Sequence, residues 1–184
     1  MKRFLISTIV ILLLFATEGI CSNKDCVKFA IVDRDKIISE SLAFQSIKKQ
    51  VDSEQATLQE DSSKQEEELH KIKQEISKQQ DILSEEAFSQ KMREFNESVL
   101  KVQQDLSQKN MELRESYIAT VKEVLSEVKN IASNIAGEEN IGLVLFISKE
   151  EQVFYARNEV DISDKAIKIL NKKMPSIDIK AAHK

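Results

Sequence analysis

Apolar residues recur at steps of three and four through the middle of the chain, from Phe44 to Ile135. This spacing gathers them on one side of an α-helix. The pattern is interrupted once, so it predicts two long helices, over residues 43–80 and 85–136. Only three Gly and one Pro occur in 184 residues, which is too few turn formers for an ordinary compact domain.

The interruption is the segment DILSEEA, residues 81–87. Ser84 can cap the second helix there, and Glu85 and Glu86 suit its first turn because the helix dipole favours acidic groups at that end. A break of this kind favours an antiparallel hairpin over the alternative, one continuous rod. Gly137 is expected to end the second helix as its C′ residue.

The apolar seam of the hairpin is uneven. In the first helix, Glu54, Ser62 and Gln65 occupy seam positions, whereas the second helix keeps its register with Lys109 as the one polar position. A two-helix hairpin cannot fully cover such a stripe, and partly exposed apolar side chains suit weak contact with unfolded chains. The candidate client-binding residues of this arm are Ile72, Ile76, Leu83, Phe88, Met92, Phe95 and Val99. Packing within the seam is their expected main role.

Both ends of the chain show strand-like alternation. Short strands are expected at Val27–Val32, Gly142–Ile147 and Val153–Ala156, the last two forming a hairpin with the turn SKEEQ. A final helix is expected to begin at a Ser163 cap. The strand Gly142–Ile147 is apolar on both faces and therefore needs cover on both sides. These strands would meet at the base of the arm and self-associate there.

The N-terminus is typical of an export signal. Lys2 and Arg3 precede the apolar run Phe4–Ala16, which is too short to span a bilayer comfortably. An uncleaved membrane anchor is the alternative, and cleavage before Ile20 or before Asn23 both fit. The predicted organisation is a signal peptide over 1–22, a discontinuous β-rich body over 23–42 and 137–184, and a helical arm over 43–136. Cys26 is expected to be a lone thiol that could pair between chains.

Charge and chemistry exclude several classes of function. The net charge is −4, and the basic residues alternate with acidic ones, so no basic stripe for nucleic acid is present. His70 and His183 lie far apart and away from any plausible nucleophile, and the acidic run EEELHK is better explained as a solvated helix face. The sequence therefore predicts no catalytic residue, no metal site, no cofactor and no enzyme activity.

Two terminal blocks carry a family resemblance. VKFAIVDRDKIISES at the start of the mature chain and ENIGLVLFISKEEQVFYARNEVDISDKAIKIL at its end, around a long charged hairpin, resemble the Skp/OmpH family of periplasmic chaperones. The resemblance implies a mainly α fold, with a long antiparallel hairpin arm projecting from a small β-rich oligomerisation body, and a jellyfish-like trimer enclosing clients. Body or trimer-core positions implied in this way are Phe29, Ile31, Leu143, Leu145 and Phe154.

The charge of the arm departs from the best-known family members, which are basic. Residues 43–136 hold 13 basic and 18 acidic side chains, so strong binding to lipopolysaccharide or membranes is not expected. The hypothesis is an ATP-independent periplasmic holdase that keeps unfolded outer-membrane proteins from aggregating. The alternative is an envelope coiled-coil spacer or adaptor that binds one folded partner. A nucleic-acid-compacting protein is disfavoured by charge and export.

Overall fold

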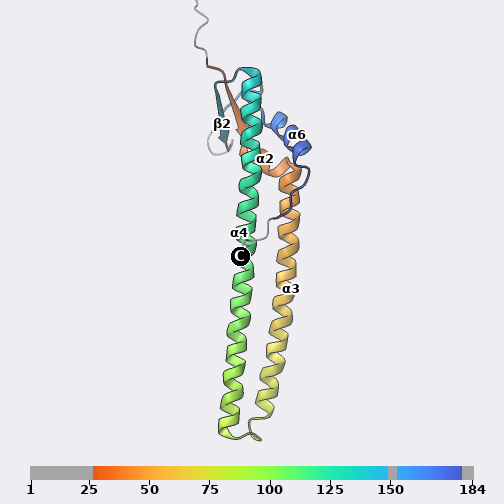
Figure 1. Cartoon of the computed structure of the whole chain (residues 1–184), viewed down its shortest axis with the longest axis vertical. Helices are drawn as coiled ribbons and strands as arrows, with labels where there is room; N and C mark the ends of the chain where they lie inside the picture. The colour runs from red at the N-terminus through yellow and green to blue at the C-terminus, as the bar shows by residue number, and fades with distance from the viewer. Residues whose placement is uncertain (1–26, 149–152, 180–184) are drawn as a thin grey trace, which may run out of the picture.

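The computed structural model describes residues 27–148 and 153–179. The expected signal peptide and Cys26 lie outside this part of the chain. Two long helices run side by side as an antiparallel pair, and a small head of strands and short helices sits at one end of them (Figure 1). The predicted arrangement, a mainly helical chain with a hairpin arm and a small β body, is confirmed.

The arm consists of α3 (Leu42–Lys78) and α4 (Glu85–Glu139). At a rise of ~1.5 Å per residue, α3 is about 56 Å long and α4 about 83 Å, so the far end of α4 extends into the head. Ser84 caps α4 as predicted, since its side chain accepts a hydrogen bond from the Ala87 N–H at 3.3 Å. The break at residues 79–84 turns the chain back on itself.

The predicted end of α4 at Gly137 is wrong. The helix continues to Glu139, and Asn140 ends it in the left-handed conformation with φ 53°. Asn is one of the few residues that adopts this conformation at low cost, so a glycine is not needed there. The Ile141 N–H then donates to the Ala136 carbonyl at 2.9 Å, which closes the helix end.

A parallel pair of strands forms the sheet of the head. β1 (Phe29–Asp33) pairs with β2 (Leu143–Ile147), with Phe29 opposite Leu143 and Asp33 opposite Ile147. The connection between them is the whole arm: the chain leaves the sheet at the Asp33 end of β1, and α4 runs past the sheet so that β2 begins at the Phe29 end, which makes the strands parallel (Figure 1).

The predicted hairpin between Gly142–Ile147 and Val153–Ala156 is wrong for the described residues. Val153–Ala156 forms no strand, and Phe154 is fully exposed. The local alternation of apolar and polar residues predicts a strand there, but among the described residues the sheet contains only β1 and β2. The neighbour of β1 on its other side is instead Asp161, through one parallel bridge to Ile31, and the Ile162 N–H donates to the Ile31 carbonyl at 3.0 Å.

Two short helices connect the sheet to the arm. In α2 (Arg34–Glu40), the N-cap is Asp33, whose Oδ1 accepts from the Asp35 and Lys36 N–H groups at 3.0 and 3.3 Å. Ser41 is extended and separates α2 from α3.

The last helix is α6 (Ser163–Lys173), which follows a short 3-10 turn, η1 (Asn158–Val160). The predicted Ser163 cap is wrong, because Ile162 holds the N-cap position and caps nothing with its side chain. Ser163 instead links two segments: its N–H donates to Asp161 Oδ1 at 2.9 Å, and its hydroxyl accepts the Asp33 N–H at 2.8 Å.

The buried core lies where the arm joins the head. It brings together one face of β1, the start of α3, the last third of α4 and the inner face of α6. Its largest fully buried apolar residues are Ile37, Ile47, Ile131, Ile135, Leu170, Val32 and Val124. Further along the arm, Ile76 is the one described apolar residue of the two helices that is buried. No helix in the described ranges is long and apolar enough to span a membrane.

Candidate functional site

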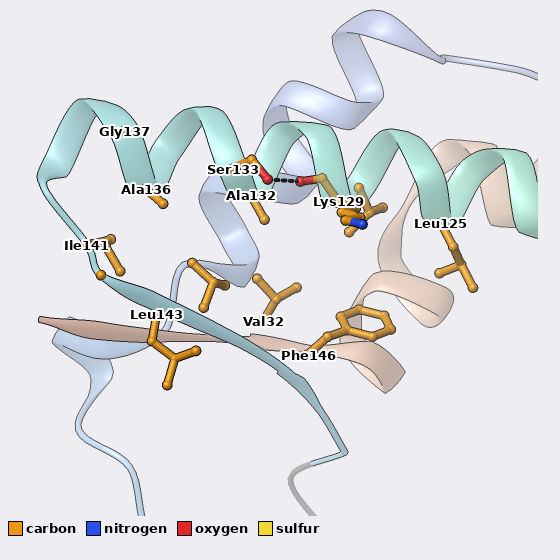
Figure 2. Close-up of a pocket in the computed structure, with 13 residues that line it drawn as sticks. Val32, Leu125, Lys129, Ala132, Ser133, Ala136, Gly137, Ile141, Leu143 and Phe146 are labelled. Atoms are coloured by element: carbon orange, nitrogen blue, oxygen red, sulfur yellow. Dashed lines mark hydrogen bonds between the residues drawn. The ribbon is translucent and has the colours of Figure 1, made fainter. Parts of the chain in front are cut away.

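A wide apolar groove of about 700 Å³ separates β2 from α4. Val32 and Phe146 point from the sheet toward α4, where Leu125, Ala132 and Ala136 point back across the groove (Figure 2). Small side chains on this part of α4 leave space that the sheet does not fill. The groove therefore presents apolar surface beside the outer side of β2.

The opposite face of the sheet is also apolar and is largely uncovered. Phe29 is 55% exposed, Leu143 50% and Leu145 42%. Among the described residues, β2 pairs only with β1, so its outer side has no strand beside it. A strand with exposed apolar side chains and an open side is a template for pairing with another chain.

The five predicted body residues do not share one environment. Phe29, Leu143 and Leu145 lie on the exposed sheet face and Phe154 is fully exposed, whereas Ile31 is buried within the single chain. Ile31 lies on the same face of the sheet as Phe29 and Leu145, and the backbone of Asp161 and Ile162 lies beside it along the edge of β1. The structure thus brings Phe29, Leu143 and Leu145 together and leaves Phe154 outside the sheet.

The predicted client-binding residues occupy the far part of the arm. Ile72 is exposed and Ile76 is buried, while the remaining five are half-buried along the seam: Leu83, Phe88, Met92, Phe95 and Val99. Ile72, Ile76 and Phe95 line a recess of about 240 Å³ between the helices. Its rim is polar, with Glu75, Gln79, Lys91, Glu94 and Ser98.

The sequence pattern missed several exposed apolar residues of the arm. Ile82 at the tip is 82% exposed, and Leu100, Met111 and Ile118 also lie on the surface of α4. They fall outside the seam positions, and single apolar residues on a charged helix give little signal. They widen the apolar surface that the arm offers to solvent.

Small polar residues are buried in the part of α4 that leads into the head. Ser116 and Thr120 are buried there, whereas the neighbouring Tyr117 is exposed. Their hydroxyls donate to the carbonyls of Glu112 and Ser116, four residues earlier, at 2.7 and 2.8 Å. Bonding to the helix's own backbone satisfies these hydroxyls, so they pack like small apolar groups.

Ion pairs join the elements of the head to one another. Lys36 of α2 contacts Asp164 of α6 at 2.6 Å, and Lys173 of α6 contacts Glu127 of α4 at 2.7 Å. The hydrogen bond from Lys173, together with one from Asn130, lowers the pKa of Glu127. The Asp164 carboxylate raises the pKa of Lys36.

Asp35 provides a second link, between α2 and the end of β2. The Ser148 hydroxyl donates to its carboxylate, and Arg34 lies 3.0 Å away. The Ser148 hydrogen bond, with a further contribution from Arg34, lowers the pKa of Asp35. The described residues gather no group of three or more His, Cys, Asp or Glu side chains that could hold a metal ion.

Comparison with known proteins identifies the family. The family model for outer membrane protein (OmpH-like) matches residues 28–170. The chain belongs to this family. The matched region includes the sheet, the whole arm and most of α6, and so contains every residue of the exposed sheet face and of the distal recess.

A solved structure shares the OmpH-like fold. It is a protein of Caulobacter crescentus CB15, provisionally assigned as an OmpH-like outer membrane chaperone, with a TM-score of 0.77 and 11% sequence identity. The match covers 87% of this chain and 93% of the other. No curated protein matches the sequence. At this identity the likeness establishes the fold, which agrees with the predicted Skp/OmpH resemblance.

Proposed function

We propose that this OmpH-like protein is an ATP-independent holdase chaperone of the periplasm, which binds unfolded outer-membrane proteins and prevents their aggregation before membrane insertion. The family assignment supports a chaperone of the Skp/OmpH type. The observation that carries the proposal furthest is the arm itself, a pair of helices too thin to cover its own apolar residues.

The arm offers many weak contacts instead of one deep pocket. Ile72 and the exposed apolar residues of α4 are spread along helices that carry mixed charge. Each contact with an extended client would be weak, and several arms acting together would raise the overall affinity through effective concentration. Candidate contact residues are those of the distal recess and its surroundings, Ile72, Ile76, Leu83, Phe88, Met92, Phe95 and Val99.

Self-association through the head would supply those several arms. The exposed sheet face formed by Phe29, Leu143 and Leu145, and the open side of β2, are the surfaces we assign to it. Phe154 would join this contact from a neighbouring subunit, and Ile31, between Phe29 and Asp33 on the same face of β1, would pack beside it. A trimer is the assembly that the family resemblance implies.

Localisation in the periplasm follows from the expected signal over residues 1–22 and from the family. The acidic arm argues against lipopolysaccharide, membranes and nucleic acid as main partners, because all three present negative charge. Neither catalysis nor a cofactor is part of the proposal.

Light scattering on residues 23–184, alone and with an outer-membrane β-barrel diluted from urea, tests the proposal. We expect an oligomer that keeps the barrel in a discrete soluble complex without ATP. A monomer or dimer that leaves the barrel to aggregate would contradict it and would favour the adaptor that binds one folded partner.

A further inference from the structure

The chain after α6 forms a strap along the arm. Met174–Ile179 follows the last helix without further regular structure and runs beside the upper part of α3 (Figure 1). We call these six residues the strap. Met174 and Ile177 are partly buried against the core of the head, so the strap is seated on the molecule by apolar contact as well as by hydrogen bonds.

Gln50 of α3 holds the strap by its main chain. Its Nε2 donates to the Ile177 carbonyl at 2.7 Å, and its Oε1 accepts the Ile179 N–H at 3.0 Å. The Ile177 carbonyl and the Ile179 N–H, two residues apart, are the pair of groups that one residue of a neighbouring parallel β-strand would bond. A glutamine side chain carries one such donor and acceptor pair, so Gln50 substitutes for a strand.

Ser46, one turn earlier on α3, completes this site. Its hydroxyl donates to the same Ile177 carbonyl at 3.2 Å, and Gln50 Nε2 also lies 3.1 Å from that hydroxyl. The polar recognition uses only backbone atoms of the strap. The polar contacts therefore require only an extended main chain. The partly buried Ile177 adds a preference for an apolar side chain at that position.

The strap has free space beside it. Met174 borders a hollow of about 430 Å³ whose other walls come from α4, including Ala119, Lys122 and Ser126. A neighbouring or longer segment could enter this hollow without moving either helix of the arm. The strap thus fills part of a surface that an extended chain could occupy more completely.

We propose that the Gln50 site binds extended apolar peptide segments of clients, and that the strap occupies it as a self-ligand until a client displaces it. This deepens the holdase proposal and rests on it. Tethering gives the strap an effective concentration on the order of millimolar, so even weak intrinsic affinity keeps it seated. A client already held by several arms reaches a similar effective concentration and can compete.

The test uses the mature chain, residues 23–184, and a blocked synthetic peptide of residues 174–179. In the strap variant, Ile177→Ser with Ile179→Pro, the buried side chain and the Ile179 N–H are removed while Gln50 is kept. Asp178→Ala, at an exposed strap position, is the matched control. Peptide binding is followed by NMR titration through the backbone amide signals of residues 46–50 in every variant, and also through the side-chain amide of Gln50 in the variants that keep it.

We expect the strap variant to bind the peptide about tenfold more tightly than the wild-type chain or the Asp178→Ala control, because the tethered competitor is gone. Adding Gln50→Glu, which replaces the donor with a carboxylate, should abolish that binding. Equal binding by the strap variant and the wild type would overturn the proposal, as would binding that survives Gln50→Glu.

A second assay distinguishes this inference from the proposed function. It measures how well each variant keeps an outer-membrane β-barrel, diluted from urea, in solution. If wild type and strap variant both fail to hold the barrel while the peptide still binds, the holdase proposal fails and the peptide site stands without a client. If both hold the barrel equally well and the peptide does not bind, the site fails and the holdase proposal stands. Both are supported if the strap variant holds more barrel per protein.

Discussion

Ile131 lies at the centre of the buried side of α4 and is 1% exposed. Ile131→Ala should lower the free energy of unfolding by about 2–5 kcal/mol, because it removes buried methylene groups and leaves a cavity in the core. Ile118→Ala, on the exposed side of the same helix, is the matched control and should change it by less than about 0.5 kcal/mol. Urea unfolding followed by circular dichroism, at one protein concentration, measures both. Similar losses for the two variants would show that the core is not where the structure places it.

Acid should weaken the head through Asp35 and Glu127. The pKa of each is lowered in the folded chain, by Ser148 and Lys173 respectively, so the folded state binds these protons less tightly than the unfolded state. Their contribution to stability is complete above the ordinary carboxyl range near pH 4 and is lost as the pH falls through the lowered values. The melting temperature should therefore drop between about pH 4 and pH 2.

The Glu127→Gln variant should show a smaller drop over that range, because it has no carboxylate to protonate at the contact with Lys173. Glu97→Gln, at an exposed position of the arm, should retain the full drop. A Glu127→Gln profile parallel to that of the wild type would rule out this contact as a source of the acid sensitivity.

At single positions, sequence reasoning worked where side chains are large and apolar and failed where polar groups are satisfied locally. Ile131 and Ile135 were placed correctly in the seam. Ser116 and Thr120 were not identified as buried residues. Their burial depends on hydrogen bonds to their own helix, which a hydropathy pattern does not reveal.

At the level of elements, both long helices and the turn between them could be read from the sequence because helical periodicity and the Ser84 cap are local signals. The parallel pairing of β1 and β2 could not. It depends on where the arm returns to the head, and alternation within Val153–Ala156 says nothing about whether a partner strand lies nearby.

The arm should be much less stable in its middle than at its base. Between Leu58 and Leu69 the side chains of α3 include no buried residue, and the ion pair across to α4, Asp61 with Lys109 at 3.4 Å, is half-exposed. Amide hydrogen exchange measured by mass spectrometry should show fast exchange over 52–70 and slow exchange over 120–136, because buried apolar contacts set the cost of local opening.

Replacing that polar pair tests the cause of the difference. Asp61→Leu with Lys109→Leu should slow exchange in the middle of the arm while leaving 120–136 unchanged, since apolar packing there would replace an exposed ion pair of little value. Uniform slow exchange along the wild-type arm would contradict the prediction.

For the whole molecule, the arrangement separates two tasks. The core that holds the chain together is confined to the junction of arm and head, while the sheet face and the far arm leave apolar side chains in water. A chain with its stability concentrated in this way can expose apolar surface along the arm without unfolding. The same division predicts that changes on the exposed sheet face disrupt association of chains, whereas changes on exposed positions of the arm leave it intact.

Leu143→Lys with Leu145→Lys places two charges on the exposed sheet face and should convert the protein to a monomer, because charged side chains on an open strand oppose pairing with another chain. The matched control, Leu100→Lys with Ile118→Lys, adds the same charge on exposed apolar positions of α4 and should keep the wild-type mass in light scattering. The head variant should also lose most of its capacity to hold an unfolded barrel, because one arm alone lacks the gain from multiple contacts. A head variant that keeps the wild-type mass would place self-association elsewhere on the molecule. A monomer that holds the barrel as well as the wild type would instead show that a single arm is enough.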